Sequence, residues 1–191
     1  MRSLVIVVLL AALVATTQPA RSGDGDGDHG CNVAYAGLKM LSDPQRKLVN
    51  LHPKMTTVTA INALPQPHPT PTTRSTAFSR RVWQVAGQIT EFKLEGDSDI
   101  HLVLFDHGDY LIAEMPAANC IPKTARDRKA MIAARKKFEE KCGKPTDHWQ
   151  PLGAVAVISG VGFFDKPHTQ KPHAQNFAEL HPVTGLNISA C

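Results

Sequence analysis

Apolar and polar side chains alternate along the second half of the chain, which is the period expected of β-strands. In "DIHLVLFD" every second residue from Ile100 to Leu104 is aliphatic. Turn formers separate five such segments, which we predict to be strands: 82–96, 99–106, 110–116, 153–165 and 176–188. Asp97 and Asp99 should stabilise the turn between the first two strands. The fourth strand is apolar on both faces and should be central, and the fifth should bend or end at Pro182.

One segment repeats its apolar residues at a spacing of three and four, which predicts a helix over 124–141. Met131, Ala134 and Phe138 mark its buried stripe, and Gly143 follows as a stop signal. Three strands, a helix and two further strands is the order of an OB-fold. We therefore predict an α+β, mainly β fold: a small OB-like five-stranded antiparallel barrel with one helix between strands three and four. A small open sheet with one helix packed on it is the alternative.

The first 22 residues have the pattern of a secretory signal peptide. Arg2 precedes an unbroken apolar run from Leu4 to Val14, and small residues follow. The run is shorter than the roughly 20 apolar residues that a membrane span needs. We therefore expect cleavage, no membrane span afterwards, and an exported protein, periplasmic or extracellular. The expected organisation is a signal peptide over 1–22, a linker and N-terminal arm over 23–80, and the OB-like β domain over 81–191.

Turn formers and prolines dominate the segment between the signal peptide and the β domain. The stretch "GDGDGDHG" has no apolar residue and predicts a solvated linker. It does not fit a calcium loop, because His29 and Tyr35 stand where that loop needs glycine and glutamate. Residues 31–64 predict an extended arm with one short helical turn near 58–64. The proline-rich stretch "PQPHPTP" then indicates a linker or a polyproline II strap over the surface.

Four cysteines in an exported chain are disulfide candidates, with three possible full pairings: Cys31, Cys120, Cys142 and Cys191. A helix over 124–141 would be about 27 Å long, and the residues from Cys120 to its start reach back only about 14 Å. A disulfide needs Cα atoms within roughly 7 Å, which disfavours Cys120–Cys142. Cys31 with Cys120 or with Cys142 remains open, and Cys191, the last residue, is a candidate for a free thiol.

The net charge of +4 is too small to indicate a nucleic-acid or membrane partner. Basic residues gather on the predicted helix, where a solvated face accounts for them better than an anionic partner does. The aromatic residues of the β domain mostly fall on apolar faces, whereas single-strand binders expose aromatics in a basic groove. Nucleic acid is therefore disfavoured as a partner despite the OB-like order of elements.

Several blocks of the chain keep a recognisable order and spacing: "VNLHPKMTTVTAINALP", "LEGDSDIHLVLFD", "LIAEMPAANC", "GVGFFDKPHTQ" and "NFAELHPV". Over residues 38–188 they resemble a widespread family of small exported bacterial proteins of unassigned function. The resemblance implies a bacterial extracytoplasmic setting and an N-terminal arm that belongs to the folded unit. This chain has "HTQKPHAQN" where members of that family often have "HGQTGVAPN", so Pro172 and His173 replace flexible residues.

Candidate metal ligands lie on two predicted strands. His101 lies on the second, and Glu179 and His181 lie two residues apart on the fifth, so these last two point the same way. Two imidazoles and a carboxylate would make an acceptable zinc site with an open position for water. Glu114 or Asp165 would then serve as the general base. A structural hydrogen-bond network is favoured over this metal site, because the three residues carry no recognised ligand spacing.

The loop between the last two strands offers a second polar cluster, formed by Asp165, His168 and His173. OB-folds often use this loop for ligands. We expect His168, Gln170 and Asn176 to contact a ligand there.

These observations favour an exported bacterial single-domain binding or accessory module. Its extracytoplasmic ligand, which the sequence does not identify, would bind at the barrel mouth formed by the loop "FDKPHTQKPHAQN" and the ends of strands two and five. The first alternative is a metal-dependent, phosphoesterase-like hydrolase in which His101, Glu179 and His181 hold a divalent ion such as zinc. The second is a structural envelope protein without a small ligand.

Overall fold

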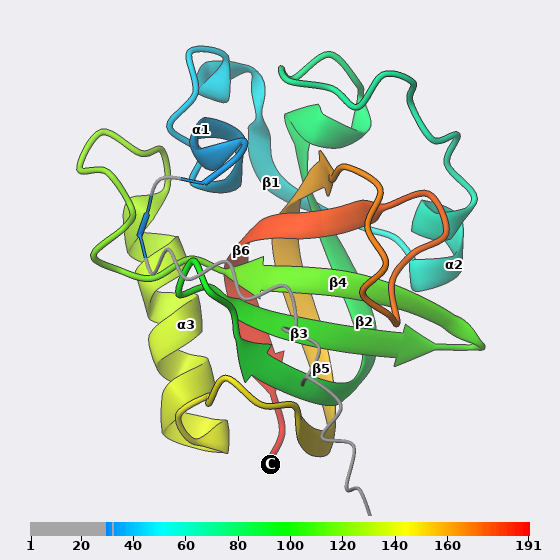
Figure 1. Cartoon of the computed structure of the whole chain (residues 1–191), viewed down its shortest axis with the longest axis vertical. Coiled ribbons are helices and arrows are strands. Elements are labelled where there is room, and N and C mark those ends of the chain that lie inside the picture. The colour runs from blue at the N-terminus through cyan, green and yellow to red at the C-terminus, as the bar shows by residue number, and fades with distance from the viewer. Residues whose placement is uncertain (1–29, 32) are drawn as a thin grey trace, which may run out of the picture.

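The computed structural model describes residues 30, 31 and 33–191, so the predicted signal peptide and most of the acidic linker lie outside the described residues. The described part is mainly β (Figure 1). Its strands are β1 (Asn50–Met55), β2 (Arg81–Leu94), β3 (Ile100–Asp106), β4 (Asp109–Met115), β5 (Gln150–Phe164) and β6 (Ala178–Ile188). Its helices are α1 (Ala36–Lys39), α2 (Val58–Asn62) and α3 (Arg128–Cys142), with 3-10 turns η1 (Arg46–Leu48) and η2 (Phe78–Arg80).

The count of six strands corrects the prediction of five. Strands β2 to β6 overlap the five predicted segments, and β1 is the additional one. It lies at the edge of the sheet, where it pairs with β2, and most of its side chains are exposed. Pro53 interrupts its donors, as is common in edge strands. A strand of this kind has no alternation of apolar residues from which it could be predicted.

All six strands belong to one sheet in the order β1-β2-β3-β4-β6-β5, and β2 also pairs with β5. The pairings from β2 through β3, β4, β6 and β5 therefore return to β2. The sheet is mixed rather than antiparallel as predicted, because β1 runs parallel to β2 and β4 runs parallel to β6. The second parallel pair follows from the connection through α3: β5 is antiparallel to β2, so β6 returns in the direction of β4.

The β3–β4 hairpin fixes the register on which the polar site depends. Asp106 pairs with Asp109 across a two-residue turn in which His107 and Gly108 both have positive φ, 48° and 92°. Such turns match the twist of the strands that they join. Counting back from the turn places His101 directly opposite Glu114.

Helix α3 is confirmed, but it begins at Arg128 rather than near residue 124. The residues before it are held by the N-terminal arm. The Arg126 guanidinium donates hydrogen bonds to three arm carbonyls, those of Arg46, Lys47 and Val49, and its backbone N–H donates to the carbonyl of Leu41. Farther along the helix, Phe138 is fully buried and packs edge-on against Phe92 of β2, with ring centroids 5.0 Å apart. The helix thereby closes one end of the core.

The N-terminal arm packs into the molecule. Val58 and Ile61 of α2, which matches the predicted helical turn, join the main core, and so does Phe78. Leu41 and Val49 form a second buried cluster with residues of β2, β5 and α3. Gly162 of β5 lies so close to the carbonyl oxygen of Phe78 that a β-carbon there would collide with it.

The proline-rich segment is anchored by a buried arginine that follows it. Arg74 is 1% exposed and pairs with Asp43, with 2.9 Å between Nη2 and Oδ2. Its guanidinium also donates to the carbonyl oxygens of Leu38 and Ser79. Because every one of these partners belongs to the arm or to η2, the segment is bound to the folded unit at its C-terminal end.

Two disulfides close the described chain. Cys31–Cys120 is one of the two pairings that the sequence left open, and it ties the N-terminal segment to the loop after β4. Cys142–Cys191 joins the end of α3 to the C-terminus, which corrects the expectation of a free Cys191. This pairing depends on the tertiary structure, because β6 packs against α3 and thereby brings the C-terminus close to the end of that helix. Disulfides are typical of proteins in oxidising compartments outside the cytoplasm.

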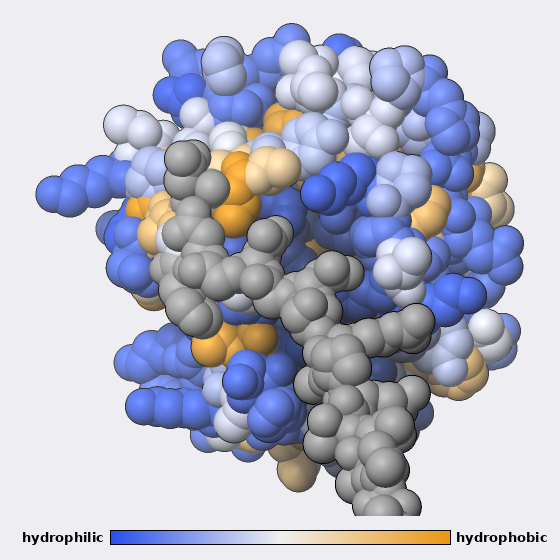
Figure 2. All heavy atoms as spheres, viewed as in Figure 1, coloured by the Kyte–Doolittle hydropathy of each residue, from blue (hydrophilic) through white to orange (hydrophobic). Residues whose placement is uncertain are grey.

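Two surface properties bear on partners. Within the described part of the chain, no helix is both long enough and apolar enough to cross a membrane. Figure 2 shows hydrophilic side chains over most of the visible face, with hydrophobic ones in small separate patches. The part of this face that the grey trace leaves visible therefore presents no broad apolar surface.

Candidate functional site

Four polar residues on neighbouring strands point away from the main core: His101 of β3, Glu114 of β4, and Glu179 and His181 of β6. The residues that alternate with them, among them Leu102, Ala113 and Leu180, belong to the core. All four polar residues are nevertheless at most 7% exposed. The outer face of the sheet is therefore covered at this place.

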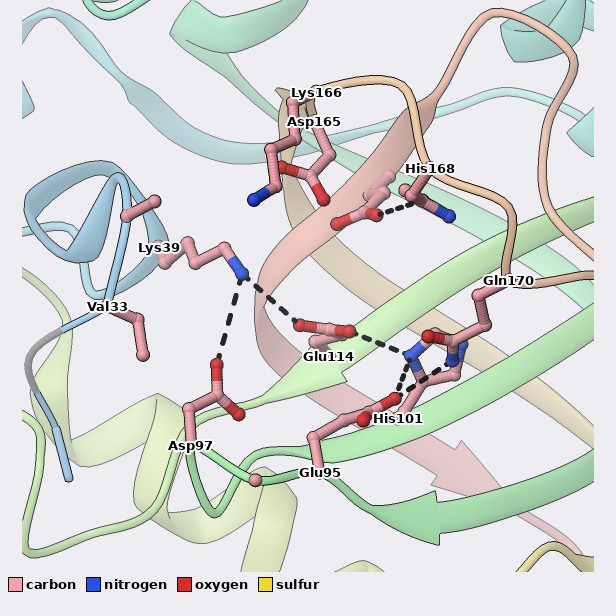
Figure 3. Close-up of a pocket in the computed structure, with 13 residues that line it drawn as sticks. Val33, Lys39, Glu95, Asp97, His101, Glu114, Asp165, Lys166, His168 and Gln170 are labelled. Carbon is pink, nitrogen blue, oxygen red and sulfur yellow. Dashed lines mark hydrogen bonds and ion pairs between the residues drawn. The ribbon is translucent and has the colours of Figure 1, made fainter. Parts of the chain in front are cut away.

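The cover consists of α1 and two loops. Lys39 comes from α1, Glu95 and Asp97 from the loop after β2, and Asp165, Lys166, His168 and Gln170 from the loop between β5 and β6. With His101, Glu114 and Glu179 they line a pocket of about 500 Å³ (Figure 3). The lining holds five carboxylates and two lysines, so the pocket is acidic.

Glu114 is the centre of the buried part of the site. Its Oε1 accepts a hydrogen bond from His101 Nδ1 at 2.8 Å, and its Oε2 lies 3.0 Å from His181 Nδ1, in ion-pair contact without hydrogen-bond alignment. Lys39 Nζ is 4.0 Å from the same Oε2 (Figure 3). Burial raises the pKa of Glu114, but the charges of His181 and Lys39 outweigh it and hold that pKa well below its usual range.

His101 shares its Nδ1 between two carboxylates, since Glu95 Oε1 lies 3.1 Å away. Gln170 donates to the same Glu95 oxygen at 2.9 Å, and the edge of the His101 ring packs against Trp149. Burial alone would lower the pKa of His101, but the hydrogen bonds to Glu114 and Glu95 raise it to about 9. This imidazole is therefore an imidazolium at neutral pH.

His181 lies behind the pocket and is completely buried. Its Nε2 hydrogen-bonds Asp99 Oδ2 at 3.1 Å, and Asp99 Oδ1 accepts from the backbone N–H of Ala117. Burial lowers the pKa of His181, but the charge of Glu114 and the bond to Asp99 raise it well above its ordinary value. The predicted turn role belongs to Asp97, which accepts from the N–H of Asp99, while the Asp99 carboxylate orients the histidine.

The third part of the site joins the loop to β6. His168 Nε2 lies 4.0 Å from Glu179 Oε1, too far for a hydrogen bond, and Asp165 lies beside both. Burial raises the pKa of Glu179 to about 7, and the nearby charges of Glu114 and Asp165 add to the shift. Burial lowers the pKa of His168, so its imidazole is neutral at pH 7. The ring of His168 packs edge-on against His173 and Phe177.

Among the described residues, three groups bring potential metal-binding atoms within 4.8 Å of one another: Glu95, His101 and Glu114; Asp99, Glu114 and His181; and Asp165, His168 and Glu179. The predicted trio of His101, Glu179 and His181 is not one of them. Its members are neighbours in a chain of contacts, in which Glu114 lies between His101 and His181 and Glu179 lies 3.7 Å from His181.

The structure brings most of the other predicted site residues to the pocket as well. Asp165, His168 and Gln170 line it, as does Glu114. Asn176 does not: its side-chain amide donates to the carbonyls of Ile61, Asn62 and Leu64, and its Oδ1 accepts from the N–H of Ala178. Asn176 therefore fastens the end of the loop to α2.

Sequence reasoning missed four charged residues that line the pocket: Lys39, Glu95, Asp97 and Lys166. Two of them carried a usable signal. Glu95 and Asp97 follow β2 directly and precede β3, so hairpin geometry places them near His101. Lys39 had none, because only the tertiary position of the arm brings α1 over the sheet.

Comparisons with known proteins add no identity. No protein-family model matches the chain, and no curated protein matches it. Among solved structures, one protein assigned as an aspartyl-tRNA synthetase, from Leishmania major Friedlin, superposes with a TM-score of 0.40 and 11% sequence identity. The match covers 72% of this chain and 21% of that one, so this chain spans about a fifth of its length. A likeness of this size carries no argument about function.

Proposed function

We propose that this protein is an exported binding module of OB-like architecture, whose ligand binds in the acidic pocket above β3, β4 and β6. The supporting observation is where the pocket lies. OB-type folds bind ligands on the outer face of their second and third strands, between the loops that follow strands one and four. In the circuit β2-β3-β4-β6-β5 the corresponding elements are β3, β4 and the loops 95–99 and 165–177. These elements line the pocket together with the α1 segment and β6.

The chemistry of the lining supports a class of ligand. Four carboxylates and the partly ionised Glu179 outnumber two lysines and the His101 imidazolium, so the lining keeps a negative excess that repels phosphate groups and favours cations or molecules with many hydroxyl groups. Two lining residues, Glu179 and His101, also have buried polar atoms, Oε2 and Nε2, without a hydrogen-bond partner among the described residues. Buried polar groups are normally satisfied, so a polar ligand that reached these atoms by displacing neighbouring side chains would complete their hydrogen bonding.

The exported setting is part of the same proposal. It is supported by the two disulfides, by the signal-peptide pattern of the first 22 residues, and by the resemblance to a family of exported bacterial proteins.

A thermal-shift experiment tests the binding function, because a ligand of the native state raises the apparent melting temperature. The protein is prepared without the predicted signal peptide, residues 1–22, and kept in EDTA to remove metal ions. Spermidine, glucosamine, cellobiose or AMP is then added. We expect at least one of the first three to stabilise the protein and AMP to have no effect. The Gln170→Ala variant should lose most of the shift, because Gln170 lines the pocket and positions Glu95.

Gln88→Ala is the matched control. Gln88 lies at a separate shallow hollow and donates to the carbonyl of Gly153. Equal responses of the two variants would contradict binding in the acidic pocket. If no compound changes the melting temperature, the role of a structural envelope protein becomes the better supported one.

A metal-dependent hydrolase is the second candidate, supported by the two groups of potential ligands that line the pocket and by a third group directly behind it. Of the two predicted general bases, Glu114 is engaged on both oxygens by histidines, whereas Asp165 faces the pocket. The test is hydrolysis of p-nitrophenyl phosphate and bis-p-nitrophenyl phosphate by EDTA-treated protein, before and after addition of zinc or manganese. Absence of metal-stimulated turnover on both compounds would remove this candidate.

A further inference from the structure

Of the three groups of potential ligands, only the third lies wholly along the pocket and has no hydrogen bond among its own members within the described part of the chain. In the first group, His101 Nδ1 already makes contacts of 2.8 and 3.1 Å with Glu114 and Glu95. In the second, His181 is completely buried and does not line the pocket. In the third, Asp165, His168 and Glu179 all line the pocket.

A second observation at the third group points to a ligand. The Glu179 side chain is 4% exposed, yet among the described residues its Oε2 has no hydrogen bond and only a 3.7 Å contact with His181, an imidazole that also contacts Asp99 and Glu114. The buried Nδ1 of His168 likewise has no hydrogen-bond partner among these residues. Glu179 Oε1 and His168 Nε2 face each other at 4.0 Å without bonding. A buried carboxylate is normally compensated by donors or a cation, because burying a charge without a partner is costly.

We propose that Asp165, His168 and Glu179 bind one divalent transition-metal ion, zinc or manganese, at the wall of the pocket. This inference rests on the proposed function, because the ion would form part of the binding site. One imidazole and two carboxylates suit these ions, whereas calcium and magnesium prefer oxygen ligands alone. Three protein ligands leave a coordination position open toward the pocket, as in zinc sites that accept a further ligand.

The distances fit a single ion. Zinc bonds of about 2.0 to 2.2 Å allow two of its ligands to be at most about 4.4 Å apart. The 4.0 Å between His168 Nε2 and Glu179 Oε1 lies within that limit. The three donors all lie within 4.8 Å of one another, so small rotations of Asp165 and His168 complete the approach. Figure 3 shows both of these side chains reaching into the pocket from the loop that follows β5.

The surrounding charges support the assignment. Glu114, Glu95 and Asp97 line the same pocket as the two carboxylate ligands, with only Lys39 and Lys166 as permanent cations there. A divalent ion would offset part of this excess.

Isothermal titration of zinc chloride into the EDTA-treated, dialysed, untagged protein tests the proposal. We expect one equivalent to bind, manganese chloride to compete with it, and calcium chloride to compete at least tenfold more weakly. Asp165→Asn and His168→Gln should each weaken zinc binding at least tenfold. Glu95→Gln should weaken it much less than either of these variants, because Glu95 belongs to the first group and would act on the ion only through its more distant charge; a tenfold loss in this variant alone would move the metal to His101 and overturn the assignment.

Two controls guard against zinc bound elsewhere on the protein. His107 and His148 are 86% and 88% exposed beside Asp106 and Asp147, where they could attract zinc weakly. The double variant H107A/H148A should still bind one equivalent of zinc. In zinc-soaked crystals of the unmodified protein, anomalous diffraction should show one peak among the side chains of Asp165, His168 and Glu179. That measurement needs no variant to fold, and a peak elsewhere, or none, would overturn the proposal.

The outcomes separate this inference from the proposed function. If zinc does not bind but an organic compound still stabilises the protein through Gln170 in EDTA, the metal assignment fails and the binding module stands. If zinc binds and every organic compound fails, the ion itself is the ligand of the pocket.

Discussion

Replacement of Glu114 by glutamine tests whether the buried site is held together by charge. The substitution keeps the size of the side chain and removes the carboxylate that contacts His101 at 2.8 Å and His181 at 3.0 Å. At an effective dielectric constant of about 20, unit charges 3.0 Å apart attract each other by about 5 kcal/mol. Glutamine carries no charge, so the cost of burying the carboxylate disappears, and this offsets part of the loss. Removal of one partner of a buried ion pair usually costs about 3 to 5 kcal/mol. We therefore expect Glu114→Gln to lower the free energy of unfolding by about this amount near neutral pH.

The same reasoning predicts a pH dependence. The pKa of His101 is raised from 6.5 to about 9 in the folded protein, so its contribution to stability is complete below pH 6.5 and is lost as the pH rises through 9. Burial lowers the pKa of His101, but the hydrogen bonds to Glu114 and Glu95 outweigh it, and the net rise corresponds to about 3 kcal/mol. Urea unfolding followed by circular dichroism should therefore show a smaller effect of Glu114→Gln at about pH 9 than at about pH 6.

A surface glutamate provides the control for that measurement. Glu140 is 62% exposed and pairs with Lys136 at 3.5 Å on α3. Pairs of this kind contribute at most about 1 kcal/mol, so Glu140→Gln should change little at either pH. If Glu114→Gln costs no more than Glu140→Gln, or if its effect is the same at both pH values, the electrostatic account of the site is refuted.

Three further variants test the packing of the fold, each by urea unfolding. Gly162→Ala should destabilise the protein by about 1 to 3 kcal/mol, because the new β-carbon meets the Phe78 carbonyl; an unchanged midpoint would show that the backbone yields freely. Phe138→Ala should cost about 3 to 5 kcal/mol, since the ring is fully buried, and a loss below about 1 kcal/mol, as for a surface residue, would contradict its place in the core. The C142S/C191S variant should lose up to about 4 kcal/mol, from the entropy of a loop of 49 residues; equal stability with and without the bond would argue against that disulfide.

Parts of the candidate site could be predicted because they depend on short stretches of chain. The alternation in β3, β4 and β6 places His101, Glu114, Glu179 and His181 on one side of the sheet, and the tight turn at Gly108 fixes the opposition of the first two. The covering elements depend on contacts between distant segments. Lys39 enters the site only because α1 lies over the sheet, held by the bonds of Arg74 to the arm.

The role of individual polar residues also required the structure. Asn176 is a polar residue on the loop for which we predicted ligand contacts, yet its side chain donates three hydrogen bonds to carbonyls of the α2 segment and so anchors the end of that loop. Asp99 looked like a turn residue, and its carboxylate orients a buried histidine instead. A polar side chain has the same place in a sequence pattern whether it meets water, backbone or another charge, so the pattern cannot distinguish these uses.

The sequence by itself determined the helix α3, five of the six strands and the side of the sheet on which the site residues lie, because side-chain periodicity is a local property of the backbone. Only the tertiary structure decided the edge strand β1, the parallel pairing of β4 with β6, the partner of Cys191 and the closure of the pocket. Each of these requires two segments far apart in the chain to meet, and such meetings are fixed by the packing of the whole molecule rather than by either segment alone.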